Sequence, residues 1–237
     1  MTIFDVNFAI EQIPEVLKGV PNTIIIAVVA IIFGVLIGIV LAFVRQYKIP
    51  VLNQLTILYV SFIRGTPLVV QLYVFYYGLP YVAEMINDMF GTALNSDKFS
   101  PLLVAFVAYT INTVAYQTET FRAAITTVPA AQMEAAYSVG LSTRQALLRI
   151  IIPQAFVSAL PNIANHFVGL IKATSLAFAL KVIEIIAISK IVANEGYNYL
   201  EMYTVAALIY WGLCIFFEVI LTKYEKSLRK YEGVNYA

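Results

Sequence analysis

The hydrophobic residues of this chain are grouped into long runs that carry almost no charge. Four runs have clear limits, at about residues 23–44, 102–121, 154–180 and 203–221, and a fifth lies between residues 51 and 86. A helix of about 20 residues crosses a hydrocarbon core about 30 Å thick. Long uninterrupted runs favour helices over the short alternating strands of a barrel. The pattern therefore predicts an all-α, polytopic membrane bundle of about five transmembrane helices.

The run between residues 51 and 86 is too long for one upright crossing. A continuous helix from Val51 to Pro80 would extend about 45 Å. Thr66 and Pro67 are typical of a helix start, with a capping side chain followed by proline at the first helical position. We therefore expect an interfacial or strongly tilted helix over residues 51–63 and a crossing that begins at Pro67. That arrangement would place Arg64 at the cytosolic headgroups.

The distribution of Lys and Arg predicts the orientation, because cytosolic loops carry an excess of these residues. The N-terminus is expected outside and the C-terminus in the cytosol, which agrees with an odd number of spans. The cations expected on the cytosolic side are Arg45, Lys48, Arg122, Arg144, Arg149, Lys223, Lys226, Arg229 and Lys230. The cations expected on the outer side are Lys18, Lys98, Lys181 and Lys190.

The composition supports the membrane class and argues against several others. Of 237 residues, 61% are hydrophobic and 12% are charged, whereas about a quarter of an average soluble domain is charged. The net charge of +1 gives no basic surface for nucleic acid. Cys214 and His166 are the single residues of their types, so no disulfide framework, metal cluster or catalytic residue is predicted. The acidic N-terminal segment differs from a cleavable signal, so the first run is expected to stay as a span.

Small residues recur at every fourth position of the first run, at Ala30, Gly34, Gly38 and Ala42. A ridge of this kind lets a second helix approach closely. It predicts a packing surface and no chemistry.

The segment between the third and fourth runs, residues 122–153, has the signals of a capped helix, a turn and a second helix. Thr127 is expected to cap a short helix that begins at the next residues, and Gly140 to end that helix in a left-handed conformation. Ser142 and Gln145 have the spacing of a capping box. Pro153 is expected to mark the entry to the fourth span.

Three blocks of sequence resemble the permease subunits of ABC importers for polar amino acids. The pattern Glu134-Ala135-Ala136, Gly140, Ile150 and Ile152-Pro153 is similar to their EAA signature, with isoleucine where leucine usually precedes the proline. Residues 62–71 (FIRGTPLVVQ) resemble the start of their second span, and residues 171–176 (IKATSL) resemble their Lys-x-Thr-Ser-Leu stretch. The resemblance extends from about residue 20 to residue 228 and implies one type I ABC importer permease domain over residues 1–237.

The resemblance also implies a mechanism with partners. The loop at residues 122–153 would be the coupling helix region that docks on a cytosolic ATPase dimer, through Glu134, Ala135, Ala136, Gly140, Ile150 and Pro153. The chain has no G-x-x-x-x-G-K-[ST] phosphate loop. It is therefore expected not to be an enzyme and to bind no cofactor, while the partner ATPase holds ATP and Mg²⁺.

The other implied partners are an extracellular or periplasmic amino-acid-binding protein, a second permease copy or paralogue, membrane lipids and a polar amino-acid substrate. The implied location is the cell membrane, with several spans. The region of residues 199–218 most resembles permeases for cystine or related polar amino acids.

Polar side chains inside the spans are the candidate substrate path, because they are costly in a bilayer. Tyr109, Asn112 and Tyr116 share one face of the third span, and Asn165 and Lys172 share one face of the fourth. We hypothesise that Lys172 or Arg64 attracts the substrate carboxylate, that Asn112 and Asn165 donate hydrogen bonds, and that the helix start at Thr66 offers backbone N–H groups. The structural alternatives are hydrogen bonds between helices for both Asn residues, snorkelling for Lys172 and a packed structural role for His166.

Two other classes of protein fit the sequence less well. An ion-driven secondary transporter often shows internal repeats and carboxylates at mid-span, and neither is found: Glu119 and Glu218 lie near the ends of spans. An intramembrane enzyme would need a nucleophile and base, or several metal ligands, at one depth.

Overall fold

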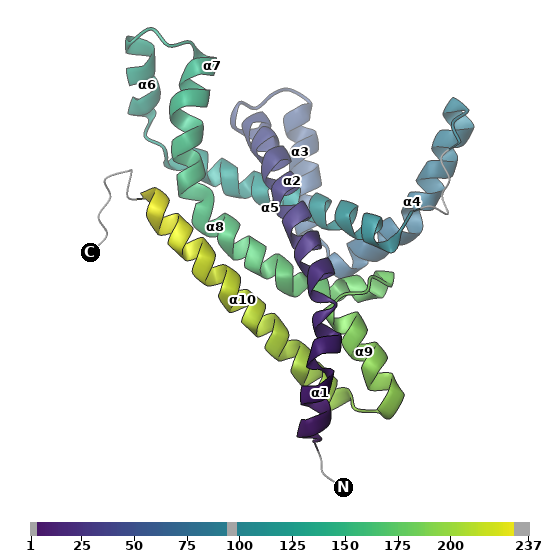
Figure 1. The fold of residues 1–237 in the computed structure, drawn as a ribbon. Coiled ribbons are helices and arrows are strands. Elements are labelled where there is room, and N and C mark those ends of the chain that lie inside the picture. The colour runs from purple at the N-terminus through teal and green to yellow at the C-terminus, as the bar shows by residue number, and fades with distance from the viewer. Residues whose placement is uncertain (1–3, 94–98, 230–237) are drawn as a thin grey trace.

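A computed structural model describes residues 4–93 and 99–229, and these residues form helices without any strand (Figure 1). The all-α prediction is confirmed for this part of the chain. Lys98 and Lys230, which enter the predicted orientation, lie outside the described residues. In chain order the elements are α1 (Val6–Leu17), α2 (Val20–Gln46), α3 (Leu52–Gly65), α4 (Leu68–Phe90), α5 (Pro101–Thr127), α6 (Ala130–Ser138), α7 (Thr143–Ala146), the π-helix η2 (Leu147–Ile151), α8 (Ile152–Ala173), the 3₁₀-helix η3 (Thr174–Leu180), α9 (Ile185–Gly196) and α10 (Tyr199–Arg229).

The centre of the bundle is the pair α2 and α5, which pack along the small-residue ridge of α2. Ala30, Gly34, Gly38 and Ala42 are all buried. A Cβ atom on Gly34 would lie 2.3 Å from Cγ2 of Thr113, and one on Gly38 would lie 2.7 Å from Cβ of Gln117. The ridge therefore serves packing inside this chain, and the close approach requires glycine at these positions.

α3 and α4 are joined by a sharp break, with a bend of 111° between their axes. The predicted break at Thr66 and Pro67 is confirmed, but the predicted capping is wrong. Pro67 is the N-cap of α4 and no side chain caps that helix. The hydroxyl of Thr66 instead donates back to the carbonyl of Phe62 in α3, at 2.9 Å. A threonine before proline suits either the start of one helix or the end of another. Here the Phe62 carbonyl at the end of α3 is available, so the Thr66 hydroxyl bonds to α3 and does not cap α4.

α3 packs along the middle of α5, and its interfacial or strongly tilted placement in the membrane stays a prediction. The Tyr59 hydroxyl donates to the carbonyl of Ile111 at 2.5 Å, and Val60 and Ile63 bury against Ala115. Burial of this apolar face determines the path of α3. Arg64 consequently lies beside the middle of α5 instead of at one end of the bundle.

Three helical stretches are long and apolar enough to cross a membrane: residues 20–46, 143–180 and 199–228. The bent pair α3 and α4 qualifies jointly as a fourth. α5 has 27 residues, a sufficient length, but the polar residues along it lower its hydropathy. The expected number of about five spans requires α5 to cross as well, and this stays a prediction.

The entry to the fourth span is more continuous than the sequence suggested. α7, η2, α8 and η3 follow one another without a break, and the N–H of Ile152 bonds to the carbonyl of Leu147 in a π-helical pattern. Pro153 lies in the first turn of α8 as expected. Because proline has no N–H to give to the preceding turn, the wider π-helical turn is accommodated just before it.

The sequence patterns did not reveal α1 and α9, which pack with the start of α10 at one end of the bundle (Figure 1). Their cluster includes Val16, Ile185 and Met202, each fully buried. The buried carboxylate of Glu184 caps α9 by accepting from the N–H groups of Ile186 and Ala187, at 2.9 and 2.7 Å. α6 and α7 project from the opposite end of the bundle (Figure 1).

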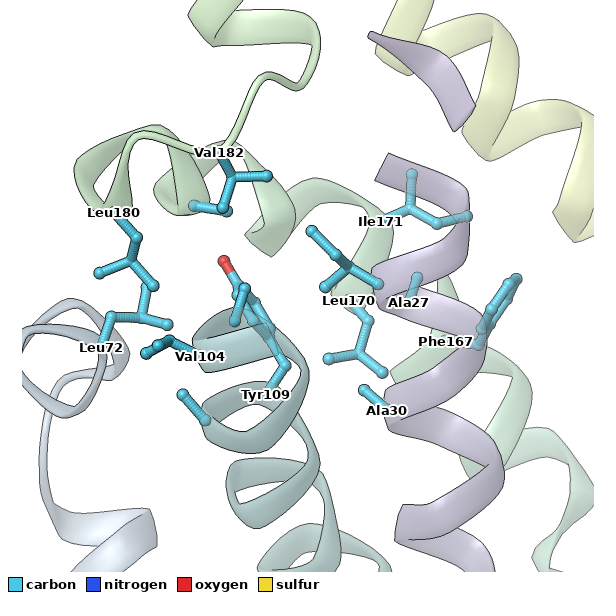
Figure 2. Close-up of a cluster of buried hydrophobic side chains, with 14 residues drawn as sticks. Ala27, Ala30, Leu72, Val104, Tyr109, Phe167, Leu170, Ile171, Leu180 and Val182 are labelled. Carbon is cyan, nitrogen blue, oxygen red and sulfur yellow. The ribbon is translucent and has the colours of Figure 1, made fainter. Parts of the chain in front are cut away.

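The largest apolar cluster joins α2, α4, α5, α8 and the segment after α8. Figure 2 shows Tyr109 of α5 in this cluster, with its hydroxyl directed toward the chain near Val182. That hydroxyl donates to the carbonyl of Ala173 at 2.7 Å. Tyr109 is fully buried, so it offers no surface to a passing solute in this arrangement.

Candidate functional site: a cationic cluster at mid-bundle and an exposed helical hairpin

Three helices bring a cation and two aromatic rings together beside the middle of α5. The guanidinium carbon of Arg64, at the end of α3, lies 5.4 Å from the ring centroid of Tyr116 in α5. The imidazole of His166 in α8 stacks on the same tyrosine, with centroids 5.1 Å apart and planes at 27°. A cation over an aromatic face is stabilised by about 0.5–2 kcal/mol, depending on its exposure to water. Tyr116 therefore gives Arg64 a defined place in an apolar bundle.

The depth of this cluster follows from its position along α5. At 1.5 Å per residue, Tyr116 lies about 22 Å from the start of α5 and about 16 Å from its end. Arg64 is exposed and its side chain forms no ion pair in the described part of the chain. An arginine held at this depth without a carboxylate partner is available to an anionic group of a ligand.

The corner between α3 and α4 is tied to α5 by two buried amides. The Nδ2 of Asn112 donates to Oε1 of Gln71 at 2.9 Å. The Nε2 of Gln71 donates to the carbonyls of Ile63 and Thr66, at 2.7 and 3.1 Å, and to the Thr66 hydroxyl at 2.8 Å. These contacts satisfy backbone carbonyls that the broken helix would leave unpaired.

The structure gathers some of the predicted path residues and separates others. Arg64, Thr66, Asn112 and Tyr116 belong to the cluster. Asn165 and Lys172 are exposed on α8, and in the described residues neither forms a hydrogen bond, ion pair or ring contact with these four. The hypothesis that pairs Asn112 with Asn165 at one site therefore has no support from contacts in this chain and stays a prediction.

Two members of the cluster were not predicted as site residues. The sequence assigns no role to Gln71, which ends the block at residues 62–71, and predicts a structural role for His166. The ring nitrogen Nε2 of His166 is buried without a hydrogen-bond partner among the described residues. A buried polar atom of this kind usually has a partner. The signal in the sequence was the adjacency of His166 to Asn165 on a polar face, which spacing alone could not orient.

The second candidate region is the exposed hairpin formed by α6, a turn and α7. Gly140 adopts φ +82°, so the predicted left-handed turn is confirmed. The N–H of Leu141 returns to the carbonyl of Ala136 at 3.0 Å, the closure expected for a glycine-terminated helix. The predicted capping box is confirmed too, because the side chain and N–H of Ser142 both pair with Gln145.

The predicted cap at the start of α6 is wrong. α5 continues through Thr127, and α6 begins at Ala130 with Pro129 as its N-cap and no side-chain cap. The Thr127 hydroxyl donates to the carbonyl of Ala124 at 2.7 Å and lies 3.0 Å from that of Ser158 in α8. Burial of Ala124 and Ile125 extends α5 past the predicted limit.

The signature residues divide into an inner and an outer set on this hairpin. Ala136 is buried and holds α6 close to the rest of the hairpin, and Ile150 is half-buried in η2. Glu134, Ala135, Gly140 and Pro153 are exposed. The carboxylate of Glu134 forms no hydrogen bond or ion pair within residues 4–93 and 99–229. The outer set therefore presents a carboxylate and little side-chain bulk to any partner.

Hollows flank the hairpin where it meets the ends of α2 and α5. One of about 560 Å³ is lined by Phe43, Tyr47, Arg144, Leu147 and other residues, and one of about 450 Å³ adjoins α6. Near this end Glu119 pairs with Arg122, at 2.8 Å, and with Arg45 of α2. The ends of α2 and α5 are thus tied together, and Met133 of α6 and Leu147 of η2 pack against the apolar cluster between them.

The described residues contain no group of three His, Cys, Asp or Glu side chains that could hold a metal ion. The comparisons with known proteins agree with the geometry. Residues 34–230 match the family described as "binding-protein-dependent transport system inner membrane component". The chain is 40% identical over 227 residues to the probable amino-acid ABC transporter permease protein PatM of Vibrio harveyi, covering 96% of this chain and 97% of the relative.

A second relative is the L-cystine transport system permease protein TcyL of Bacillus subtilis (strain 168), 35% identical over 227 residues, with 96% of this chain and 92% of the relative covered. A crystal structure of an amino acid ABC transporter matches with a TM-score of 0.80 and 29% identity, over 96% of this chain and 100% of that chain. A structure of the MetNI methionine ABC transporter shares the fold, with a TM-score of 0.71 and 17% identity, over 92% of this chain and 98% of that chain. The predicted type I importer permease fold is confirmed, and the chain belongs to the binding-protein-dependent inner membrane component family, among the permeases of amino-acid ABC transporters.

Proposed function

We propose that this chain forms the translocation path of an importer for a polar amino acid, with Arg64 receiving the substrate carboxylate. The single observation that carries the proposal is the arginine held over Tyr116 at mid-bundle. A bidentate guanidinium matches a carboxylate in geometry and charge. The start of α4 lies two residues beyond α3 and has no side-chain cap, so its backbone N–H groups and helix dipole favour the same anion.

Other members of the cluster suit the rest of an amino acid. Asn112 uses its nitrogen on Gln71, which leaves Oδ1 to accept from the substrate ammonium. His166, stacked on Tyr116, offers to the substrate an Nε2 that has no hydrogen-bond partner in the described residues, whereas the Thr66 hydroxyl is already bonded to Phe62 and Gln71. Lys172 and Asn165, exposed on α8, would contact substrate only in a wider or differently arranged path.

Family members are transport subunits that are not enzymes by themselves, and they work with a nucleotide-binding subunit. For this chain the proposed docking surface is the α6–α7 hairpin, through Glu134, Ala135 and Gly140. Ile150 and Pro153 would carry the motion into α8. The hydrolysis of ATP with Mg²⁺ would take place in the partner dimer, and this chain would act as one transmembrane domain.

The proposed orientation places α6 and α7 in the cytosol and α1 and α9 outside, in the cell membrane. A loaded amino-acid-binding protein would then dock at the α1–α9 end. Because one chain gives few spans around a path, a second permease copy or paralogue would complete it. ATP and the loaded binding protein would each favour one of two bundle arrangements, which couples their effects.

Cystine is the finer candidate substrate. It is favoured by the relatedness to TcyL and to a second cystine permease, TcyB, which is 35% identical over 219 residues. Cystine has two carboxylates and a flexible disulfide, so one carboxylate can bind Arg64 while the remainder contacts His166.

The test is uptake by the chain reconstituted in proteoliposomes with its ATPase and binding protein. We expect ATP-dependent uptake of a polar amino acid, and competition by amino acids but not by cystamine or agmatine, amines that lack the carboxylate. Uptake without an ATPase, or equal competition by the carboxylate-free amines, would contradict the proposal.

A further inference from the structure

We infer that Gln71 is a positioning residue, whose side chain latches the corner between α3 and α4 onto α5 and so holds Arg64 over Tyr116. The inference rests on the proposed function of Arg64. It assigns to Gln71 an effect on substrate affinity without contact between Gln71 and the substrate.

The first half of the latch joins α4 to the end of α3. Gln71 lies in the first turns of α4 and its side chain is buried, with 4% relative exposure. Its Nε2 reaches the carbonyls of Ile63 and Thr66 at 2.7 and 3.1 Å, and the Thr66 hydroxyl at 2.8 Å. Ile63 and Thr66 flank Arg64 in the sequence. The amide therefore fixes the backbone on both sides of the arginine.

The second half of the latch joins this corner to α5. Oε1 of Gln71 accepts from Nδ2 of Asn112 at 2.9 Å. Asn112 lies one helical turn before Tyr116, the residue under the Arg64 guanidinium. One amide thus connects the backbone that carries Arg64 to the helix that carries the aromatic ring.

The orientation of the Gln71 amide follows from its neighbours. The nitrogen faces three acceptors, and a reversed amide would place oxygen against the two carbonyls. An apolar residue of the same size would fill the space without these contacts. A buried amide with all its hydrogen bonds made restricts the movement of its partners. Loss of its donors leaves buried carbonyls unsatisfied.

The backbone alone does not fix the corner. The 111° bend interrupts the helical hydrogen bonds between α3 and α4, so the direction of the end of α3 depends on side-chain ties. In the described residues, the other hydrogen bond from α3 to α5 runs from Tyr59 to the Ile111 carbonyl, more than one turn before Arg64. The remaining contact is the non-directional apolar packing of Val60 and Ile63 on Ala115. Without Gln71, the last turn of α3 could move relative to Tyr116.

The experiment measures the KM for ATP-driven amino-acid uptake by the complete reconstituted complex carrying Gln71→Leu or Gln71→Glu. Both substitutions remove the N–H donors. We therefore expect KM to rise by about tenfold, the change in affinity that corresponds to the loss of about one hydrogen bond. Assembly with the ATPase and its basal ATP hydrolysis should stay unchanged. The matched control is Gln117→Met. Gln117, on α5, is a buried glutamine like Gln71, but its side-chain amide makes no hydrogen bond in the described residues. Its KM should equal that of the wild type.

A double-mutant cycle with Arg64→Gln separates positioning from general damage. If Gln71 acts through Arg64, Gln71→Leu should add no further rise in KM once the guanidinium is gone. An equal rise in both backgrounds would overturn the inference, as would a wild-type KM in both Gln71 variants.

Thr66→Val provides the same test if neither Gln71 variant accumulates. It removes one of the three acceptors of the Gln71 amide, so it should raise KM less than tenfold, and only when Arg64 is present. An equal change with and without Arg64 would overturn the inference. If the wild-type complex transports no amino acid, the proposed function itself fails. If the wild type transports and the Gln71 variants behave as the control does, this inference alone fails.

Discussion

Arg64 is a charged side chain beside the middle of a membrane bundle, where charge is costly unless it has a partner or a function. The sequence identified this residue within a family block, but its depth along α5 could not be inferred because the path of α3 was not known. Packing of Val60 and Ile63 against Ala115 decides that depth. This is a tertiary contact, and no local pattern in residues 51–67 encodes it.

The first prediction concerns the charge on Arg64. Arg64→Gln should raise the KM for uptake by about 10- to 100-fold, because a hydrogen bond to a charged group is worth about 1.5–3 kcal/mol. Arg64→Lys should keep part of the affinity, since lysine keeps the positive charge but cannot bind the carboxylate through two parallel N–H groups. Uptake assays with the assembled complex measure both. A KM within twofold of the wild type for Arg64→Gln would remove Arg64 from the path.

The second prediction concerns Gly34 on the packed face of α2. A Cβ atom there would lie 2.3 Å from Thr113 Cγ2, so Gly34→Leu should lower stability by about 1–3 kcal/mol or more through overpacking. Thermal unfolding in detergent should show a lower midpoint. Gly212→Leu is the control, since a Cβ there meets nothing within 4 Å. Equal midpoints for the two variants would contradict the packing of α2 on α5.

The third prediction concerns Glu184, the cap of α9. Burial raises the pKa of its carboxyl above the ordinary value of 4.5. A carboxyl that holds its proton more tightly in the folded chain favours folding at low pH, so its contribution falls as the pH rises from 4.5 through the raised pKa. In the Glu184→Gln variant, the thermal unfolding midpoint should fall less steeply as the pH rises from 4.5 through the raised pKa. An unchanged pH profile in the variant would contradict the assignment.

At the scale of elements, the α6–α7 hairpin was predicted best because its signals are local. Gly140 and the Ser142–Gln145 box act within a few residues, and local chemistry of this kind can be inferred from sequence. The end of α5 at Thr127 and the π-helix η2 were missed, since burial of Ile125 and continuity with α8 determine them. α1 and α9 were missed because their apolar residues form short patterns between the long membrane runs.

The fourth prediction concerns the stiffness of the hairpin. Gly140→Val forces a β-branched residue to φ +82°, which costs about 1–2 kcal/mol or more. Ser142→Ala removes a capping bond worth about 1 kcal/mol. Both should weaken the coupling of ATP hydrolysis to uptake while substrate affinity stays constant. The moles of ATP hydrolysed per mole of amino acid transported measure this coupling. A changed KM with unchanged coupling would contradict the separation between hairpin and substrate path.

At the scale of the whole molecule, the described residues form a helical bundle with two candidate functional regions, the cluster around Arg64 and the exposed α6–α7 hairpin. The sequence predicted the class and both regions, because hydrophobic runs and family blocks cover nearly the whole chain. It did not predict which polar residues converge. Arg64, Tyr116 and His166 come from three separate helices, and their convergence depends on how α3, α5 and α8 pack. Asn165 and Lys172 have suitable chemistry, are exposed on α8 and form no hydrogen bond or ion pair with the cluster in the described residues, so their role in the path stays a prediction.

The most direct test compares uptake driven by an active ATPase with uptake driven by an ATPase unable to hydrolyse ATP, each assembled with this chain and the binding protein in proteoliposomes. The result predicted here is amino-acid accumulation only with the active ATPase and ATP, with none supported by an ion gradient alone. Equal accumulation with the inactive ATPase, or accumulation by the chain alone under an ion gradient, would contradict the proposal that a partner drives this bundle through α6 and α7.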